Sequence, residues 1–355
     1  MLAENYGMTV RLSAMTTHSF ASGLKFILGE PTTGMSVQEM EGGASNRTYH
    51  RVTCGAQSWV VMVLADEPLR SEEASSGPIA DELPFVEMQR FLEAQSVRVP
   101  VIHRYDKNNG HIWLEDLGDV VLGDTLLDAT PTERVHQYCE AVDLLVQFQI
   151  ATAGTREKPI CYKRRFEPAL LRWELDHYRE WRLETQLGRT LHTSVKTALE
   201  EEFDRLVERL VGLPQILCHR DFQSRNLMVL PNDELVLIDF QDALVGSFCY
   251  DLVALTRDSY IQLTDDQVDA IVGHYLARRT DLDKKTFRAA FHWQTIQRKL
   301  KDSGRFVYID RVKKNPDFLR FIEPSLGYVR AALEKTPELS RLHELLVELD
   351  PEAFA

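Results

Sequence analysis

The 355-residue sequence predicts an α+β fold of two lobes, a small β-rich lobe at residues 21–118 and a larger helical lobe at residues 119–355. Segments rich in β-branched and aromatic residues precede residue 118, whereas segments with helical spacing and helix caps follow it. The length also favours two lobes, because single hydrophobic cores rarely grow past roughly 250–300 residues. Residues 1–20 come before the first plausible strand and are expected to form a flexible N-terminus.

The small lobe is predicted to contain three strands and one helix. Residues 48–52 and 58–64 are rich in β-branched and aromatic side chains and flank a short turn. The third expected strand, residues 111–114, follows an Asn-Asn-Gly turn. Between these strands, apolar residues from Phe85 to Leu92 recur at helical spacing, which predicts a helix there.

The large lobe is predicted to consist mainly of helices. Its first helix opens with a capping box from Thr130 to Glu133, has Pro131 at the first helical position, and is expected to run to about Ala153. Gly154 then stops it. The other expected helices cover residues 167–182, 193–211, a segment capped by Thr264, 285–301 and 337–349.

The composition excludes several classes of protein. Hydrophobic residues make up 44% and charged residues 27%, which is ordinary for a soluble globular enzyme. The net charge of −13 argues against nucleic acid as a partner, because most of the surface would repel phosphates. No run of about 18 apolar residues is present, which excludes a membrane-spanning helix. The five cysteines are scattered, so the sequence predicts neither a disulfide framework nor a zinc site and favours a cytoplasmic location.

A short polar motif lies in the middle of the chain. His219-Arg220-Asp221 is followed by Asn226 and then, beyond a predicted hairpin, by Ile238-Asp239-Phe240. The hairpin consists of two apolar runs, 227–230 and 235–238, joined by turn residues. Because a hairpin returns the chain to its starting point, Asp221, Asn226 and Asp239 are expected to meet in one cleft.

The spacing H-R-D-x-x-x-x-N followed by D-F is typical of the catalytic loop and metal-binding aspartate of protein-kinase-like phosphotransferases. Phosphoryl transfer needs oxygen ligands for Mg²⁺ and a carboxylate that accepts the proton of the attacking hydroxyl. Asp221 is therefore the predicted base, and Asn226 and Asp239 are the predicted Mg²⁺ ligands. The alternative is a chance match, in which three buried polar residues merely satisfy one another.

Two segments of the small lobe are candidates for contacts with a nucleotide. Small residues after Glu41 allow backbone N–H groups to approach phosphate oxygens, although a Gly-Gly pair is also common in a plain hairpin turn. The segment 113–119 is expected to cross between the lobes and to offer backbone groups to an adenine edge, unless its acidic residues merely face water. The predicted cofactor-binding residues are Gly43, Ala44, Ser45, Asn46, Arg47, Glu115 and Leu117.

These motifs resemble those of the aminoglycoside phosphotransferase superfamily, and within it the bacterial kinases that phosphorylate the anomeric hydroxyl of N-acetylmuramate and N-acetylglucosamine in cell-wall recycling. The resemblance implies ATP as donor, Mg²⁺, a sugar acceptor, a nucleotide-binding small lobe and a large lobe that carries catalysis and binds the acceptor. It implies the same roles for Asp221, Asn226 and Asp239. The matching segments are 42–47, 97–100, 114–119, 219–221 with 224–226, 238–243, 250–253 with 257–258, and 297–298 with 300–301.

The chain departs from the kinase pattern at the strand position where a lysine usually grips the phosphates. That position is Met62, so no ammonium is present there to pair with a helix carboxylate such as Glu87. We expect Arg47 or Arg225 to supply the missing charge, because a guanidinium fork matches phosphate oxygens.

The acceptor is less well defined by the sequence than the reaction. Arg225, Asp242 and Arg298 are candidate contacts with the substrate. An ordinary exposed loop acid is an equal interpretation of Asp242, and a surface charge is the plainer interpretation of Arg298. Asp251 is expected to be the N-cap of a helix, with support of the catalytic loop as a second role. An aminoglycoside, choline or homoserine kinase is an alternative function, and a pseudokinase that binds nucleotide without transfer is another. Oligomeric state does not follow from the sequence.

Overall fold

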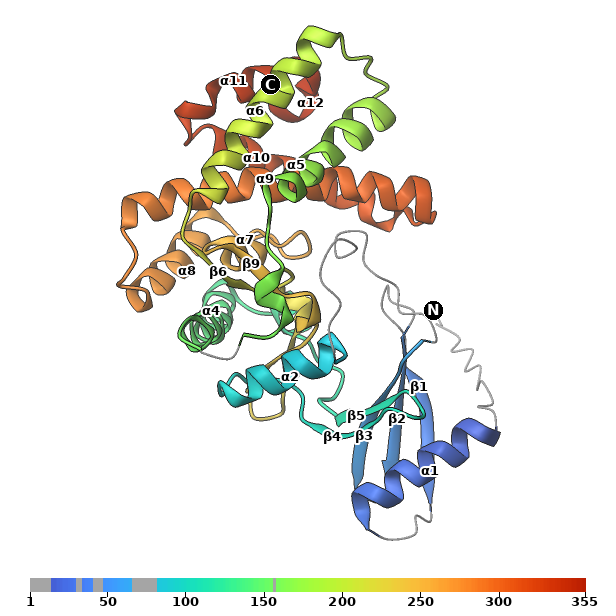
Figure 1. The fold of residues 1–355 in the computed structure, drawn as a ribbon. Coiled ribbons are helices and arrows are strands. Elements are labelled where there is room, and N and C mark those ends of the chain that lie inside the picture. Colours follow the sequence, from blue (N-terminus) through green and yellow to red (C-terminus); the bar gives the residue numbers. More distant parts are fainter. Residues whose placement is uncertain (1–13, 30–33, 41–46, 66–81, 156–157) are drawn as a thin grey trace. The chain divides into compact units, whose positions relative to one another are not determined.

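The computed structural model describes residues 14–29, 34–40, 47–65, 82–155 and 158–355. The chain divides into two units, residues 1–75 with 99–118, and residues 76–98 with 119–355 (Figure 1). Within the described ranges, no helix combines the length and the hydropathy that crossing a bilayer requires. The secondary structure confirms the predicted α+β class, because an antiparallel sheet is followed by a mostly helical remainder.

The first unit is a five-stranded antiparallel sheet with strand order β1-β2-β3-β5-β4, accompanied by one helix (Figure 1). The three strands expected from β-branched and aromatic content are present, and two edge strands of more polar sequence join them. The elements are α1 (Ala14–Leu28), β1 (Met35–Met40), β2 (Thr48–Cys54), β3 (Gln57–Val63), β4 (Ile102–Asp106) and β5 (His111–Glu115).

Helix α1 packs on the sheet through Phe20 and Leu24, which join a core of strand residues that includes Trp59 and Trp113. A Cβ atom at Gly23 would lie 2.5 Å from the Trp113 indole, so glycine is what lets the helix approach this closely. Phe20 is fully buried. Residues 14–20, part of the segment expected to be flexible, are helical, and residues 1–13 lie outside the described ranges.

The second unit holds two small sheets and nearly all of the helices. Strand β6 (Gln215–Cys218) pairs with β9 (Leu244–Ser247), and β7 (Leu227–Val229) pairs with β8 (Leu235–Leu237), both antiparallel. The β7–β8 pair is the predicted hairpin. The helices are α2 (Pro84–Ala94), α3 (Leu122–Leu127), α4 (Pro131–Ala153), α5 (Pro168–His177), α6 (Thr193–Val211), α7 (Tyr250–Thr256), α8 (Asp265–Arg278), α9 (Lys284–Lys313), α10 (Ile322–Leu333), α11 (Ser340–Leu349) and α12 (Pro351–Phe354).

Short 3₁₀ and π-helical segments complete this unit, and two of them flank the hairpin. The short segments are η1 (Ile160–Lys163), the π-helical η2 (Tyr178–Gln186), η3 (Ser224–Asn226), η4 (Phe240–Asp242), η5 (Pro316–Phe321) and η6 (Pro337–Leu339).

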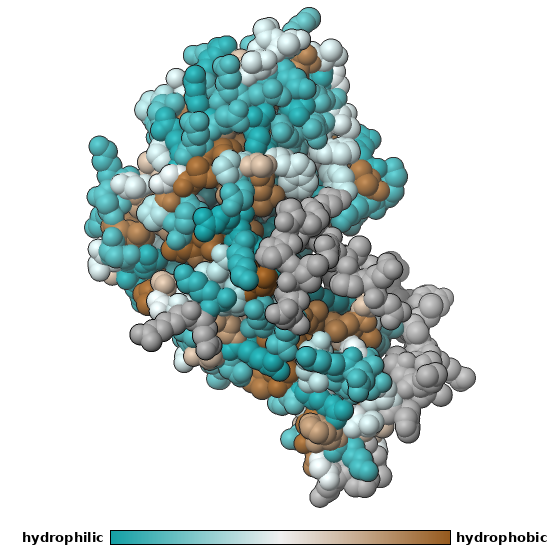
Figure 2. Space-filling view, in the orientation of Figure 1, coloured by the Kyte–Doolittle hydropathy of each residue, from teal (hydrophilic) through white to brown (hydrophobic). Residues whose placement is uncertain are grey.

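Helix α2, expected in the small lobe, belongs to the second unit, where Phe85 stacks on Phe240 with ring centres 5.1 Å apart. Elsewhere in this unit, Figure 2 shows that the face over α6 and α11 is largely hydrophilic.

Helix α9 is the longest helix of the described chain and packs along α5 and η2 (Figure 1). It continues well past residue 301, where the expected helix ended. The close contact lies at Gly304, whose added Cβ would meet the backbone oxygen of His177 at 2.2 Å. The backbone of α9 is therefore in direct contact with the C-terminal end of α5 at this point.

The C-terminal segment is tied to η2 by a buried ion pair. Arg182 donates from Nε and Nη2 to the two carboxylate oxygens of Asp350, at 2.8 and 3.0 Å. The hydroxyl of Tyr178 donates to the same carboxylate at 3.2 Å. Because a bidentate guanidinium pair fixes both distance and angle, this contact anchors the last residues of the chain to the helix that packs on α9.

Candidate active site

The predicted catalytic loop follows β6, and a buried carboxylate supports its backbone. Asp251 accepts the backbone N–H groups of His219 and Arg220 at 2.7 and 3.0 Å. The N-cap of α7 is instead Cys249, so the N-cap interpretation of Asp251 is wrong and its second role, support of the catalytic loop, is what the structure shows. Burial raises the pKa of Asp251, while the charge of His219 and the two N–H donors oppose that rise.

Replacing Asp251 with asparagine is expected to weaken this support. Asparagine keeps one acceptor oxygen but points an NH₂ group at the second backbone donor, so one buried N–H loses its partner. We expect a loss of about 1–2 kcal/mol in the free energy of unfolding, measured by urea titration, and a roughly tenfold lower kcat. Asp265→Asn removes the same charge from a side chain that is 72% exposed and serves as the control. Equal effects of the two changes would contradict the assigned role.

Asp221 is half-exposed and is oriented by a buried arginine. Nη2 of Arg298 lies 3.3 Å from Oδ1 of Asp221, and Nη1 donates to the carbonyl oxygen of Arg220 at 2.9 Å. Burial acts to raise the pKa of Asp221, but the positive charges of Arg298, Arg220 and Lys301 outweigh it and lower this pKa. The group is therefore a carboxylate at neutral pH, able to accept a proton.

Arg298 lies behind the base instead of on the substrate surface. Its side chain is 2% exposed, and its guanidinium also lies over the ring of Tyr250, 4.9 Å from the centre. The direct substrate contact expected for Arg298 does not fit this position. The residue is a positioning group that fixes Asp221 and the loop before it.

Asn226 and Asp239 lie at the open end of the hairpin. The side-chain amide of Asn226 donates from Nδ2 to the backbone carbonyl oxygen of Asp221 at 2.8 Å, and the backbone carbonyl of Asn226 accepts the N–H of Ile238 at 3.1 Å. Asp239 is exposed, and its Oδ1 accepts a hydrogen bond from Gln241 at 2.7 Å. The structure therefore brings Asp221 and Asn226 into contact and places Asp239 directly after the hydrogen bond that closes the hairpin.

Arg220 in the predicted catalytic loop and Asp239 after the hairpin adopt the left-handed backbone conformation, although neither is a glycine. Arg220 has φ 78° and Asp239 has φ 64°. Such residues cost on the order of 1–3 kcal/mol each and persist where the surrounding structure fixes them. Here Asp251 and Arg298 fix Arg220, while Gln241 contacts Asp239. Two of the described non-glycine residues with positive φ are thus the residue before the predicted base and a predicted metal ligand itself.

The remaining predicted site residues are the substrate candidates Asp242 and Arg225 and the residues expected to bind the nucleotide. Asp242 is half-buried and its carbonyl accepts from Arg220 at 3.5 Å, whereas Arg225 is exposed and its guanidinium lies over the ring of Tyr260. Glu115 ends β5, where its Oε2 accepts the N–H of Val101. Leu117 is buried and Arg47 directly precedes β2. Gly43, Ala44, Ser45 and Asn46 lie outside the described residues.

Glu87 of α2 has a partner other than a lysine. Its Oε1 accepts the backbone N–H of Ile160, at the start of η1, at 3.1 Å. In the first unit, Met62 is fully buried in β3. The chain therefore uses the helix carboxylate to fix η1 within the second unit.

A buried carboxylate to which the sequence assigns no role supports the other side of the loop. Asp258 is fully buried, and its Oδ2 accepts both the N–H and the hydroxyl of Ser224, at 3.2 and 2.6 Å. Lys299 is also fully buried and donates to Asp302 at 2.8 Å. The sequence carries no clear signal for either residue, because Asp258 follows the end of α7 and Lys299 lies in a helix with many other charged side chains.

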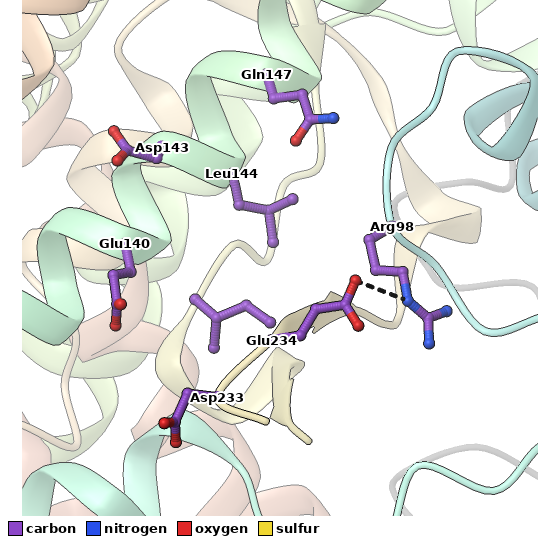
Figure 3. Close-up of a pocket in the computed structure, with 8 residues that line it drawn as sticks. Arg98, Glu140, Asp143, Leu144, Gln147, Asp233 and Glu234 are labelled. Atoms are coloured by element: carbon purple, nitrogen blue, oxygen red, sulfur yellow. Dashed lines mark ion pairs between the residues drawn. The ribbon is translucent and has the colours of Figure 1, made fainter. Parts of the chain in front are cut away.

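A cavity of about 250 Å³ lies elsewhere, between α4 and the turn of the β7–β8 hairpin (Figure 3). Acidic side chains line much of it, and Arg98 pairs with Glu234 across 3.4 Å at its edge (Figure 3). Asn226 and Asp239 flank the opposite end of the same hairpin. None of the predicted catalytic or metal-binding residues lines this cavity, so it is not the reaction site.

Comparison with known proteins decides the family. A model described as the Phosphotransferase enzyme family matches residues 36–287, well over half of the chain. The chain belongs to this family. Two relatives of this phosphotransferase are each named N-acetylmuramate/N-acetylglucosamine kinase. The protein from Pseudomonas putida is 29% identical over 92% of both chains, and that from Pseudomonas aeruginosa is 31% identical over 88% of both chains.

Solved structures confirm the kinase fold of this phosphotransferase. A choline kinase from Streptococcus pneumoniae superposes with a TM-score of 0.58 at 16% identity, covering 92% of this chain and 100% of that one. An aminoglycoside phosphotransferase with bound ADP gives a TM-score of 0.55 at 16% identity, covering 89% of this chain and 98% of that one. At this identity the likeness shows the fold alone, and the protein is a small-molecule kinase by its family.

Proposed function

We propose that this kinase transfers the γ-phosphoryl group of ATP to the anomeric hydroxyl of an N-acetylated amino sugar. The observation that carries the proposal is the half-exposed Asp221 carboxylate, which Arg298 holds and the surrounding cations keep ionised. The exposed Asp239 follows the hydrogen bond between Ile238 and Asn226 that closes the hairpin. Carboxylates in these two places suit a base and a metal ligand. The names of the curated relatives supply the sugar class.

Asp221 accepts the proton of the attacking hydroxyl. An anomeric hydroxyl is more acidic than other sugar hydroxyls because the ring oxygen withdraws charge, so a carboxylate with a low pKa is a sufficient base. Arg298 keeps Oδ1 of Asp221 fixed, which leaves the other carboxylate oxygen to meet the acceptor. The residue thus combines orientation of the hydroxyl with proton acceptance.

The donor set at the open end of the hairpin fits Mg²⁺. The side-chain NH₂ group of Asn226 donates to the Asp221 carbonyl, which leaves the side-chain amide oxygen able to bind the metal ion. Asp239 offers a carboxylate. Within the described residues, no cluster of three or more His, Cys, Asp or Glu side chains forms a metal site. One carboxylate, one amide oxygen and nucleotide phosphates are ligands that Mg²⁺ accepts, and the bound ion would neutralise developing phosphate charge.

Arg47 is our candidate for the charge that Met62 does not provide. It follows the expected phosphate cover at Gly43, Ala44, Ser45 and Asn46 and directly precedes β2. Changing Arg47 to alanine is expected to raise the KM for ATP about tenfold, because a charge-assisted hydrogen bond to phosphate is lost. The KM for the acceptor should stay close to its original value in the same initial-rate assay. An unaltered KM for ATP would remove Arg47 from this role.

The product identifies the function. The protein, Mg²⁺ and ATP are incubated separately with N-acetylmuramate, N-acetylglucosamine, choline and an aminoglycoside, and the products are recorded by ³¹P NMR. We expect an acid-labile anomeric phosphate from the amino sugars. The methyl glycoside of N-acetylglucosamine, which has no free anomeric hydroxyl, is the matched control and should give none. Transfer only to choline or the aminoglycoside would replace the proposal, and no transfer to any acceptor would indicate a pseudokinase.

A further inference from the structure

Arg225 is an exposed cation that stacks on an aromatic ring instead of pairing with an acid. The centre of its guanidinium lies 3.6 Å from the centre of the Tyr260 ring. Among the described residues, no carboxylate forms an ion pair with Arg225 and no acceptor receives a hydrogen bond from it. The cations of α9 differ, because Arg298, Lys299 and Lys301 all have carboxylate partners. The Arg225–Tyr260 pair therefore presents unused N–H donors to the solvent.

One buried carboxylate fixes both members of this pair. Asp258 receives the N–H and hydroxyl of Ser224 on Oδ2, and the N–H of Tyr260 on Oδ1 at 3.0 Å. Lys299 donates to the hydroxyl of Ser259 at 2.7 Å, which holds the intervening residue. The backbone before Arg225 and the backbone of Tyr260 are thus connected through the buried Asp258 carboxylate. Such preorganisation lowers the cost of ordering a long side chain when a ligand binds.

The pair lies next to the reacting groups. Arg225 is within η3, between Asp221 and the predicted metal ligand Asn226. Burial raises the pKa of Tyr260, the charge of Arg225 lowers it, and the charges of Asp302 and Asp221 raise it further. The phenol ring is therefore within electrostatic reach of the base, and its other neighbour is the edge of Phe321 at 5.0 Å.

The chemistry of this pair selects a planar anion. A guanidinium offers a rigid fork of N–H donors that matches a carboxylate, and stacking on a ring keeps the fork in one plane. Of the two sugars in the names of the relatives, N-acetylmuramate carries a carboxylate on its lactyl ether and N-acetylglucosamine does not. Because the chain has a net charge of −13, an acidic acceptor needs a local cation in order to bind.

We propose that the Arg225–Tyr260 pair is the subsite for the carboxylate of an acidic amino-sugar acceptor, an inference that rests on the proposed function. The pair would then set the preference between acidic and neutral acceptors, while Asp221 and the metal ligands perform the transfer on both. The competing role for Arg225 is a contact with the transferred phosphoryl group. These two roles predict different kinetics.

The test compares kcat/KM for N-acetylmuramate and N-acetylglucosamine in the Arg225→Met variant. The ratio of the two values is expected to shift against N-acetylmuramate by about 10-fold to 100-fold, the size expected for a lost charge-assisted hydrogen bond. The KM for ATP is expected to stay close to its original value. An equal fall for both sugars together with a raised KM for ATP would assign Arg225 to the phosphoryl group and overturn the inference.

Three further variants control the test. Tyr260→Leu removes the ring under the guanidinium and is expected to move the ratio in the same direction, whereas Tyr260→Phe keeps the ring and is expected to preserve it. Arg209, whose guanidinium lies 5.2 Å from the centre of the Trp293 ring on α6 and α9, provides the matched stacked arginine. Arg209→Met should leave the ratio as it was. A shift with Arg209→Met as large as that with Arg225→Met would also overturn the inference.

A binding measurement separates this inference from the proposed function. N-acetylmuramate is titrated calorimetrically into Asp221→Asn protein, with and without Arg225→Met, in the presence of Mg²⁺ and ADP. A weaker affinity only when Arg225 is replaced supports the carboxylate subsite even if neither sugar is phosphorylated. Equal affinities in the two proteins reject the subsite even if both sugars are substrates.

Discussion

Asp221→Asn and Asp239→Asn are each expected to lower kcat by about 100-fold to 10,000-fold while the fold survives. The first change removes the proton acceptor but keeps a side chain of the same shape beside Arg298. The second change removes the carboxylate that would bind Mg²⁺. Initial rates with N-acetylglucosamine or N-acetylmuramate give the effect, and circular dichroism with thermal melting shows that the protein is still folded.

Nucleotide binding distinguishes the two roles. Asp221→Asn should bind Mg²⁺ and ATP with near-original affinity, whereas Asp239→Asn should bind them more weakly. Asp233→Asn makes the same chemical change at the far turn of the hairpin, at a residue whose positive φ asparagine tolerates, and should leave turnover intact. Near-original rates for Asp221→Asn or Asp239→Asn would refute the assignment of that residue.

Gly304→Ala is expected to cost about 3 kcal/mol of unfolding free energy, in spite of the higher helix propensity of alanine. The new Cβ would lie 2.2 Å from the backbone oxygen and 2.3 Å from the backbone carbon of His177, and neither atom can rotate away. The helices α9 and α5 must therefore separate. Since α9 also carries Arg298, kcat should fall together with stability.

Gly327→Ala is the matched control for this prediction. Gly327 lies within helix α10 and has open space around its Cβ position, so alanine there is expected to stabilise the protein by about 0.5–1 kcal/mol. Urea titration of both variants gives the two free energies. A neutral or stabilising effect of Gly304→Ala would show that the two helices can shift apart without cost.

Features set by neighbouring residues could be predicted from the sequence. The capping boxes at Thr130 and Thr264 and the hairpin after Asn226 are present as expected, because each depends on residues a few positions apart. The same holds for the contact between Asn226 and Asp221. Local chemistry therefore gave the central part of the candidate site.

Features set by tertiary packing could not be predicted. Arg298 reaches Asp221 from 77 residues along the chain, and nothing in its own helix indicates that it would point at the base instead of the solvent. The position of α2 in the sequence predicts that it belongs to the first lobe, yet its Phe85 packs on Phe240 of the second unit. Its apolar face was evident, but the partner of that face was not.

The contact between Glu87 and Ile160 has a consequence for regulation. In protein kinases, activity requires an ion pair between a strand lysine and a helix glutamate, and phosphorylation of a loop controls whether that pair forms. Here the strand residue is Met62, and Glu87 already holds the main chain of η1. A switch that makes or breaks an ion pair between these two positions therefore has no lysine to act on.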